Sequence, residues 1–502
     1  MMSTVLMPPL RRGRTASFLS ASLLSLLAGC VTGPAVPPRA TVAPPASPAG
    51  GDALVPSPVP GRWWRLYREP ALDALVEEAL TDNRDLRTAA ARLLEARAIL
   101  DEARGERLPQ TTVAADAGGG SSLEDQIEAA YGHSDRVRTG PRFGLGTDVV
   151  WEADLFGRLA SSVKAARADA DAAKADEDGV RVLVAAEVTR AWLDACGHAH
   201  RAGVARRSLA LVERARALAG QLRAAGAGLP VDVARADTLV AQAEAAIPAL
   251  EAGRHNALAR LAVLTGHPPT ESPAAAAACT RLPTIDVPLP VGDGLALLRR
   301  RPDVREAERR LAASTARIGV ATADLYPRIS LAGGFASSSH TPGDLAARGN
   351  IVWRIGPMLS WSFPNIGAAR ARIAQTRARE VGALARFDAA ILTALGEANQ
   401  AGEDYGAALR RREALRVAAE RSAEAARLSR LARAAGAATA LEALDAERAD
   451  VAARAALAAA DADVATAQVV LFKALGGGWE DAPAVALPAP VRAPVSARVI
   501  QP

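Results

Sequence analysis

The chain has 502 residues, of which 50% are hydrophobic but only 4% aromatic, and its formal net charge is +5. Much of the apolar fraction is alanine, which excludes a single thick globular core, because such a core needs many large side chains. Basic and acidic residues alternate, as in residues 166–178 (ARADADAAKADED), which is typical of solvated helix faces and excludes a basic patch for nucleic acid. The composition favours long helices packed closely side by side.

The N-terminus has the pattern of a bacterial export signal. Basic residues precede an apolar run over residues 18–27, which is too short to cross a membrane as a helix. The ending LAGC at Cys30 resembles a lipobox, in which the peptide is cut before the cysteine and the thiol is acylated. We therefore expect residues 1–29 to be a lipoprotein signal peptide and Cys30 to carry a covalent lipid. The alternative is an ordinary signal peptide that happens to contain a cysteine.

Two segments outside the helical region are rich in proline and alanine, and two cysteines besides Cys30 have to be placed. Residues 30–62 are rich in Pro and Ala, which predicts a tether to the lipid, and the end of the chain has a similar composition. Cys196 lies in a helical pattern and Cys279 in an alanine-rich link. In an oxidising compartment the two thiols could pair, but the sequence does not place them within reach. We expect both to be free and structural, and the CGHAH stretch from Cys196 to be a helix surface rather than a metal site.

Two segments alternate like strands with one apolar face. From Phe143 to Trp151 the odd positions are Phe, Leu, Thr, Val and Trp, and residues 351–362 repeat this pattern. Each segment is followed by a helical pattern of great length, over residues 157–225 and 367–435. Each of these helices would reach about 100 Å at 1.5 Å per residue. A strand of about 10 residues is long enough to cross a membrane, so the strands are expected to span and the helices to project.

The sequence also predicts two copies of one unit, each with a helix, a weak strand, a strong strand, a very long helix and a second helix. We place the first repeat at residues 63–270, a linker at 271–294, the second repeat at 295–478 and a terminal segment at 479–502. The residues that match in register are Asp85 with Asp303, Pro109 with Pro327, Trp151 with Trp361 and Gly157 with Gly367.

About four strands per chain are too few for a membrane barrel, since the smallest bacterial barrels have about 8. An open sheet edge cannot lie in lipid, because its N–H and C=O groups have no partner there. One chain therefore cannot close a barrel, and several copies must share one.

The sequence resembles the outer membrane efflux factors of the TolC type, and the lipobox indicates the NodT-like subset that serves RND pumps. The resemblance implies a homotrimer with about twelve strands in one barrel, a helical tunnel in the periplasm, and a small equatorial region from the linker and the terminal segment. It implies a passive exit duct that works with a periplasmic adaptor and an inner membrane RND pump. The segments that carry the resemblance are WWRLYREPALDALVEEALTDNRDLRTAAARLLEARA, WEADLFGRL, RRRPDVREAERRLAASTARIGVATADLYP and FKALGGGW.

Three groups of residues are expected to carry the function. Inward positions of a barrel that serves as a passage should be polar or small, and polar loops near 118–141 and 337–350 should face outside. In the family, the turns between long helices dock against the adaptor, and a Leu-x-x-x-Asp pattern after the second turn forms the narrowest rings of a periplasmic gate. The candidates are Asp148, Glu152, Arg354 and Ser360 for the barrel lumen; Gly226, Gly228, Leu229 and Gly436 for adaptor docking; and Leu441, Glu442, Asp445, Asp232 and Arg235 for the gate.

Other interpretations remain open. The glycines proposed for adaptor docking would also be expected in any helical hairpin, because a sharp turn needs them. The acidic residues proposed for the gate would also fit a helix face that is exposed to solvent. The sequence shows no phosphate-binding loop or catalytic constellation, so we expect neither an enzyme nor a cofactor beyond the lipid. Within the channel interpretation, the alternatives are type I protein secretion and metal efflux. A lipid-anchored coiled-coil scaffold is the alternative of another class, although a scaffold would not need strands that bear tryptophan.

Overall fold

The computed structural model describes residues 53–487 except 122, 134, 286 and 364–365. The expected signal peptide and Cys30 lie outside this part of the chain. The elements, in chain order, are β1 (Leu54–Val55), η2 (Trp63–Tyr67), α2 (Pro70–Asp82), α3 (Arg84–Gly105), β2 (Gln110–Gly120), α4 (Leu123–Tyr131), β3 (Gly140–Ala153), α5 (Arg158–Ala224), α6 (Pro230–Leu264), α7 (Ala274–Ala277), β4 (Leu289–Pro290), α8 (Gly294–Arg300), α9 (Pro302–Ala323), β5 (Arg328–Ser339), η3 (Pro342–Ala346), η4 (Arg348–Asn350), β6 (Ile351–Ser360), α10 (Ile366–Ala434) and α11 (Ala440–Ala474).

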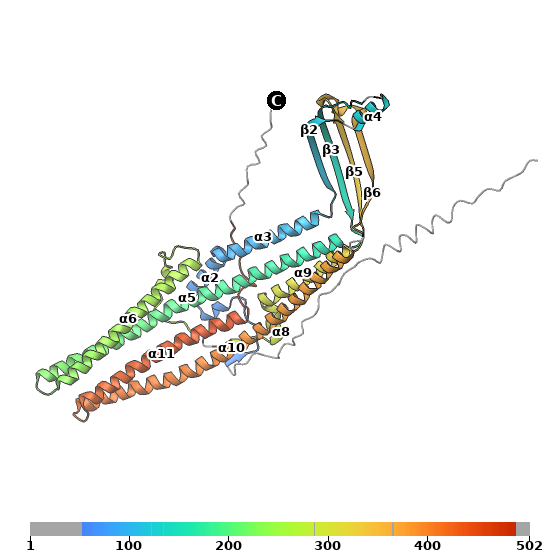
Figure 1. The fold of residues 1–502 in the computed structure, drawn as a ribbon. Helices are drawn as coiled ribbons and strands as arrows, with labels where there is room; N and C mark the ends of the chain where they lie inside the picture. Colours follow the sequence, from blue (N-terminus) through green and yellow to red (C-terminus); the bar gives the residue numbers. More distant parts are fainter. Residues whose placement is uncertain (1–52, 122, 134, 286, 364–365, 488–502) are drawn as a thin grey trace, which may run out of the picture. The chain divides into compact units, whose positions relative to one another are not determined.

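The described chain is mostly helical, as the composition predicts (Figure 1). α5 has 67 residues and α10 has 69, and both are built largely from strong helix formers. Prolines open α2 and α6, where the missing N–H removes no helical hydrogen bond. α11 is long and apolar enough to cross a membrane by composition alone. Much of its apolar character is alanine, however, and 44% of its most apolar stretch is buried within the structure.

The contacts divide the chain into two compact units. Unit 1 takes in residues 96–170 and 309–385, and unit 2 takes in the described parts of 40–95, 171–308 and 386–502. The helices α3, α5, α9 and α10 run through both units, so this division differs in kind from the division into repeats that the sequence predicts.

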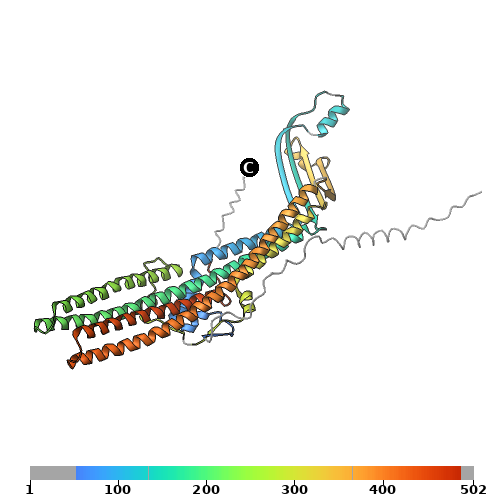
Figure 2. The same cartoon turned by 60° about the horizontal axis from the view of Figure 1, so that its bottom comes forward.

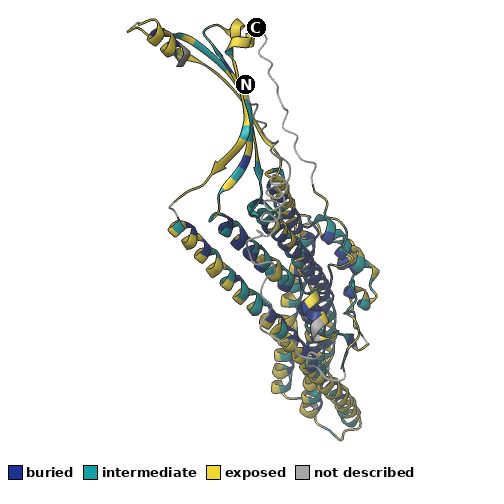
Figure 3. Ribbon diagram, turned by 90° about the vertical axis from the view of Figure 1, so that its right-hand side faces the viewer, coloured by how far each residue is buried: buried dark blue, intermediate teal, exposed yellow. Residues whose placement is uncertain are grey.

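Unit 1 contains a four-stranded antiparallel sheet in the order β2-β3-β5-β6 (Figure 1). The sheet has β2 and β6 as its edges, and among the strands that the structure describes each of them pairs with one neighbour. Most residues of these strands are exposed or only half-buried, as the colouring of Figure 3 shows. A sheet with this much exposed surface needs something else to cover it.

Unit 2 contains the main core. Trp63 stacks on Phe472 with ring centroids 4.8 Å apart, and its indole N–H donates to the carbonyl of Gly477 at 3.3 Å. The Tyr67 hydroxyl lies 3.1 Å from the side-chain oxygen of Gln468. These contacts hold the start of the described chain against the end of α11. A short parallel pair of strands, β1 and β4, lies in the same unit.

One sequence-based expectation is wrong. Cys196 and Cys279 form a disulfide, with their Cα atoms 5.2 Å apart, rather than two free thiols. The segment after α7 packs on α5, where Leu282 lies close to Gly197, and this brings Cys279 to a cysteine 83 residues away. No local pattern in the sequence reports a contact over that distance.

Candidate functional site

The four-stranded sheet has two different faces. Residues paired across antiparallel strands lie on the same face, so the strand registers assign each position to one side. Every even-numbered position from β2 to β6 falls on one face. The charged residues of that face are Asp116, Arg142, Asp148, Glu152, Arg328 and Arg354.

The odd-numbered face carries no charged residue among the described strands. It presents large apolar side chains that are strongly exposed, of which Trp353 at 73% is the extreme. An uncharged, exposed apolar face suits lipid, and a charged face rich in glycine suits water. The exposed large residues of the apolar face are Val113, Leu145, Trp151, Leu331, Phe335, Ile351, Trp353, Ile355 and Leu359, and its half-buried large residues are Phe143, Val149 and Ile329.

All four residues predicted for the barrel lumen lie on the charged face. Asp148 and Arg354 form an ion pair at 2.7 Å. Glu152 instead accepts two hydrogen bonds from Arg158, at 2.9 and 2.8 Å, and so fastens the end of β3 to the start of α5. Ser360 pairs in register with Arg328 at one end of the sheet.

The two turns between long helices share one hydrogen-bond pattern. After α5, the N–H of Gly226 donates to the backbone carbonyl of Arg223, and the N–H of Ala227 donates to the backbone carbonyl of Leu222. After α10, the N–H groups of Gly436 and Ala437 donate to the equivalent backbone carbonyls. This is the Schellman motif, which needs a left-handed residue, and φ is +72° at Gly226 and +75° at Gly436.

The other two docking candidates have different surroundings. Gly228 is needed for space, because a Cβ there would lie 3.0 Å from the backbone nitrogen of Arg223. Leu229, next to it, is 63% exposed. The first turn therefore presents an apolar side chain to its surroundings.

The predicted gate residues lie in the first turns of α11. Leu441 and Asp445 are both exposed and lie one helical turn apart. Within the described part of this single copy, Asp445 has no hydrogen-bond or ion-pair partner. Glu442 differs, because it forms a capping box with Thr439: each accepts a hydrogen bond from the backbone N–H of the other, at 2.7 and 3.2 Å. The backbone N–H of Thr439, and then its hydroxyl at 3.0 Å, donate to the Glu442 carboxylate and lower its pKa.

Asp232 and Arg235, near the first turn, do not pair with each other. The Asp232 carboxylate accepts from the backbone N–H of Leu229 at 3.3 Å, which caps the start of α6. Arg235 is exposed and has no ion-pair partner among the described residues.

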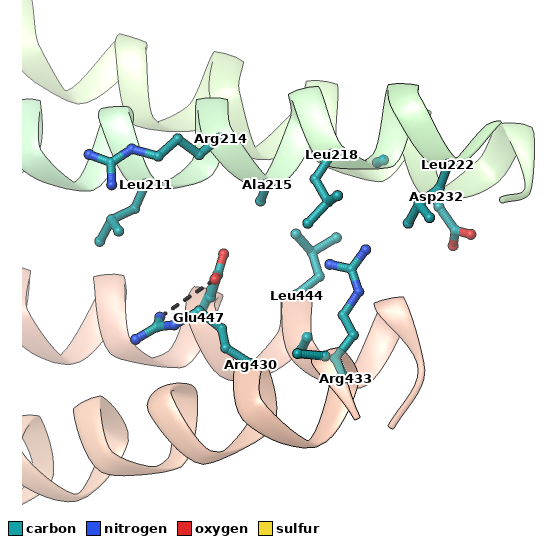
Figure 4. Close-up of a pocket in the computed structure, with 13 residues that line it drawn as sticks. Leu211, Arg214, Ala215, Leu218, Leu222, Asp232, Arg430, Arg433, Leu444 and Glu447 are labelled. Carbon is teal, nitrogen blue, oxygen red and sulfur yellow. Dashed lines mark ion pairs between the residues drawn. The ribbon is translucent and has the colours of Figure 1, made fainter. Parts of the chain in front are cut away.

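The two helical hairpins of unit 2, α5–α6 and α10–α11, lie side by side (Figure 2). A cavity of about 690 Å³ lies between them (Figure 4). Its wall is mainly leucine and alanine, with Asp232 from α6 at one end. Arg430 lies 3.6 Å from Glu447, which has one buried oxygen without a hydrogen bond. Arg433 points into the same space (Figure 4). The hairpins are therefore separated by a partly charged gap rather than by a packed seam.

The sequence reasoning did not identify Arg430, Arg433 or Glu447. A signal was available, because Arg427, Arg430 and Arg433 recur every third residue in the last turns of α10 and so share one helix face.

A charged contact of His340 fastens the segment between β2 and β3 in unit 1. His340, just after β5, has its Nδ1 2.9 Å from the carbonyl of Pro141 and its Nε2 3.0 Å from the carboxylate of Asp125 on α4. Both partners are acceptors, so only the doubly protonated imidazolium can donate to both. The Asp125 carboxylate and then the Pro141 carbonyl raise the pKa of His340, against smaller opposing effects from desolvation and then from the charge of Arg138.

This arrangement predicts a pH-dependent loop. A raised folded-state pKa means that the contact stabilises the loop fully below about pH 6.5 and weakens as pH rises through the folded pKa. We expect chymotrypsin to cut after the exposed Tyr131 of α4 several-fold faster at pH 9 than at pH 6, once corrected for its rate on an unstructured peptide. His340→Gln should be cut rapidly at both pH values. An unchanged pH dependence in that variant would show that another group fastens the loop.

No group of three or more His, Cys, Asp or Glu residues within the described ranges is placed to hold a metal ion. Cys196 of the CGHAH stretch is engaged in the disulfide and offers no thiolate.

Comparison with known proteins gives a consistent answer. The family described as outer membrane efflux protein matches residues 75–267 and 296–477. Outer membrane protein OprJ of Pseudomonas aeruginosa is 32% identical over 423 residues, which is 84% of this chain and 86% of OprJ. Pyoverdine export outer membrane protein OpmQ of Pseudomonas putida is 30% identical over 460 residues, which is 91% of this chain and 96% of OpmQ.

Solved structures that are similar to this chain are also outer membrane channels. The outer-membrane channel OprN is 36% identical with a TM-score of 0.79, over 90% of this chain and 100% of that one. The open-state MtrE channel of Neisseria gonorrhoeae is 26% identical with a TM-score of 0.76, over 90% of this chain and 99% of that one. The two-faced sheet, the long helical hairpins and these matches lead to one conclusion: the chain belongs to the outer membrane efflux protein family and is located in the outer membrane.

Proposed function

We propose that three copies of this chain form a passive exit duct for small molecules, fed by a periplasmic adaptor and an inner membrane RND pump. The observation that carries the proposal is the sheet of unit 1, with one charged face, one apolar face and two edge strands that have no further partner among the described strands. A barrel with lipid outside and water inside needs these faces, and only further copies can satisfy the edges.

Strand directions allow such a closure. Each neighbouring pair in β2-β3-β5-β6 is antiparallel, so β2 and β6 run in opposite directions. When copies are related by rotation about the barrel axis, β6 of one copy meets β2 of the next in antiparallel orientation. Two copies would give about eight strands and three about twelve, both possible for a barrel; the resemblance to TolC-type factors favours three.

The helical part supports a duplicated unit. The paired elements have similar lengths: 22 residues in both α3 and α9, 67 and 69 in α5 and α10, and 35 in both α6 and α11. Both hairpins end in the same Schellman turn. In the proposed assembly these turns contact the adaptor, and Leu441 and Asp445 form the closed gate.

Small organic molecules are the substrate class that the relatives favour. The names of three relatives refer to export of pyoverdine and to efflux of toluene and solvents. The alternatives of protein secretion, metal efflux or a scaffold without a pore have no comparable support. We also propose that Cys30 is acylated, on the evidence of the LAGC sequence alone, and that the chain needs no other cofactor and is not an enzyme.

Native mass spectrometry of the purified protein in detergent tests the assembly and the lipid together. We expect a complex of three chains, each lacking residues 1–29 and each heavier by acyl groups that Cys30→Ser removes. The same preparation should conduct ions in planar bilayers. A monodisperse monomer that is fully folded would contradict the duct, whereas a trimer without lipid would contradict only the acylation.

A further inference from the structure

The ion pair between Asp148 and Arg354 joins two strands that are not neighbours. Asp148 on β3 pairs in register with Gly334 on β5, and Gly334 pairs with Arg354 on the edge strand β6. The arginine therefore reaches across a whole strand to the carboxylate, at 2.7 Å. On the far side of Asp148 the same row continues to Thr112 on β2.

Gly334 makes this reach possible. A Cβ at Gly334 would lie 2.7 Å from the carboxylate oxygen of Asp148 and 2.6 Å from the carbonyl oxygen of Thr147, both closer than real Cβ contacts allow. Since the glycine has no side chain, the ion pair lies flat on the charged face instead of projecting from it. Asp116 lies over Gly144 in a similar way, with its carboxylate where a Cβ would be.

The other basic groups on this face are held by local partners. Arg142 donates to the carbonyl of Ser121 at 2.9 Å and to the hydroxyl of Ser338 at 2.7 Å. Arg328 pairs with Asp324 at 3.1 Å. Asp148 and Arg354 are paired with each other and are open to solvent, with 55% and 77% of their side chains exposed; Arg328 is similarly exposed, at 52%, but lies at one end of the sheet. The row of this pair crosses the middle of β5 at Gly334, whereas the exposed Asp116 lies two rows away on the same face. The pair is therefore the exposed charged group at mid-height of the face, where it can act on an ion that passes along it.

We infer that the Asp148–Arg354 pair sets the charge selectivity of the barrel by cancelling its own field. The inference rests on the proposed function, in which this face lines a water-filled passage. Two opposite charges in contact produce a field that falls off faster than that of either charge alone. If one partner is removed, each copy adds one uncompensated charge at the same height of the barrel. Small charged solutes of the opposite sign are then favoured, and the effect weakens as salt increases.

A thiol in the same row can report that field. Thr112 is exposed and lies directly opposite Asp148, so Thr112→Cys places the thiol about 5 Å from it. Cys196 and Cys279 are joined in a disulfide, so the parent chain without this substitution gives the background. The probes are an anionic and a cationic methanethiosulfonate reagent, applied to the protein in vesicles at low salt from the side of the outer loops, so that the periplasmic gate does not have to open.

The measured quantity is the ratio of the anionic to the cationic reaction rate. With Arg354→Gln the ratio should fall at least about threefold, because the remaining Asp148 carboxylate lies about 5 Å from the thiol in water. With Asp148→Asn the ratio should rise by a smaller factor, because the remaining charge, the Arg354 guanidinium, lies beyond the position of Asp148 in the row and so farther from the thiol. The double variant Asp148→Asn/Arg354→Gln should return the ratio close to that of the Thr112→Cys parent. Both single effects should shrink in 1 M salt, where screening acts within about 3 Å. Glu271→Gln, an exposed acid in the linker, should leave the ratio unchanged.

The outcomes separate this inference from the function on which it rests. If neither reagent reaches Thr112→Cys in folded protein while both label it after unfolding, the charged face does not line an open passage, and the proposed duct fails. If both reagents react at ratios that do not differ among the variants, the duct stands and the ion pair has no role in selectivity. A purely structural role predicts that the double variant is no closer to the parent than the single variants.

Discussion

The double substitution Leu441→Ala/Asp445→Ala is expected to raise the resting conductance of the purified protein in planar bilayers about tenfold or more. The physical reason is that a closed state needs only a small loss of stability to become rare, since one or two kcal/mol changes a two-state ratio by a factor of about 5–30. Leu441 is exposed in the single copy, so in the proposed trimer three such side chains can meet and form an apolar plug. Alanine would be too short to close the same opening.

Asp445 acts on the same opening through charge. Within the described part of one copy it has no partner, so a threefold axis would bring three unpaired carboxylates together or pair them with cations of neighbouring copies. A ring of three unpaired carboxylates attracts divalent cations, so in that arrangement the double variant should also be blocked less strongly by them. In the paired arrangement the substitution instead removes the ion pairs that hold the gate closed. Glu442 is less suited to this role, because its carboxylate is occupied by the capping box with Thr439.

A control and an alternative accompany this prediction. Glu271→Gln removes an exposed charge from the linker and should leave resting conductance unchanged. If the double variant folds as a trimer and stays as closed as the parent, the constriction lies elsewhere. The cavity between the hairpins then becomes the next candidate, since Asp232 and Arg433 both line it without pairing with each other and could latch the two hairpins in the assembly.

The features that the sequence predicted well are those that depend on local pattern. Alternation of apolar residues placed strands at 143–151 and 351–362, and the structure has β3 at Gly140–Ala153 and β6 at Ile351–Ser360. The long helix expected at 157–225 is α5, Arg158–Ala224. Glycines at 226 and 436 were recognised as turn formers, and both adopt left-handed conformations. Periodicity and turn chemistry act over a few residues, so they can be read without knowledge of the fold.

Features that depend on distant contacts were not predicted. The loop expected near 118–141 contains the helix α4, whose Asp125 contacts His340, 215 residues away. Glu152 was expected to line the lumen, and its position on the charged face supports this, but its bidentate bond to Arg158 could not be read from alternation. Asp148 and Arg354 were chosen separately as polar residues, and only the strand registers show that they share one row.

The disulfide is the clearest such case, and it leads to the second large expected effect. Cys279→Ser should lower the thermal unfolding midpoint by several degrees. By the chain-entropy account, a cross-link that closes a loop of 83 residues contributes about 4.5 kcal/mol by restricting the unfolded chain. This loop contains the turn after α5, all of α6 and the link to α7, so much of unit 2 depends on it.

Cys279 is the better position to change, because it is partly exposed, whereas Cys196 is fully buried and a serine there would bury a hydroxyl in the core. Reduction of the parent protein should lower its midpoint to that of Cys279→Ser, and the same treatment should not affect the variant further. Glu271→Gln, in the same linker, should match the parent in both conditions. Thiol titration of unfolded, unreduced protein decides the premise: comparable labelling of Cys196 and Cys279 before and after reduction would show two free thiols, and the original sequence-based expectation would stand.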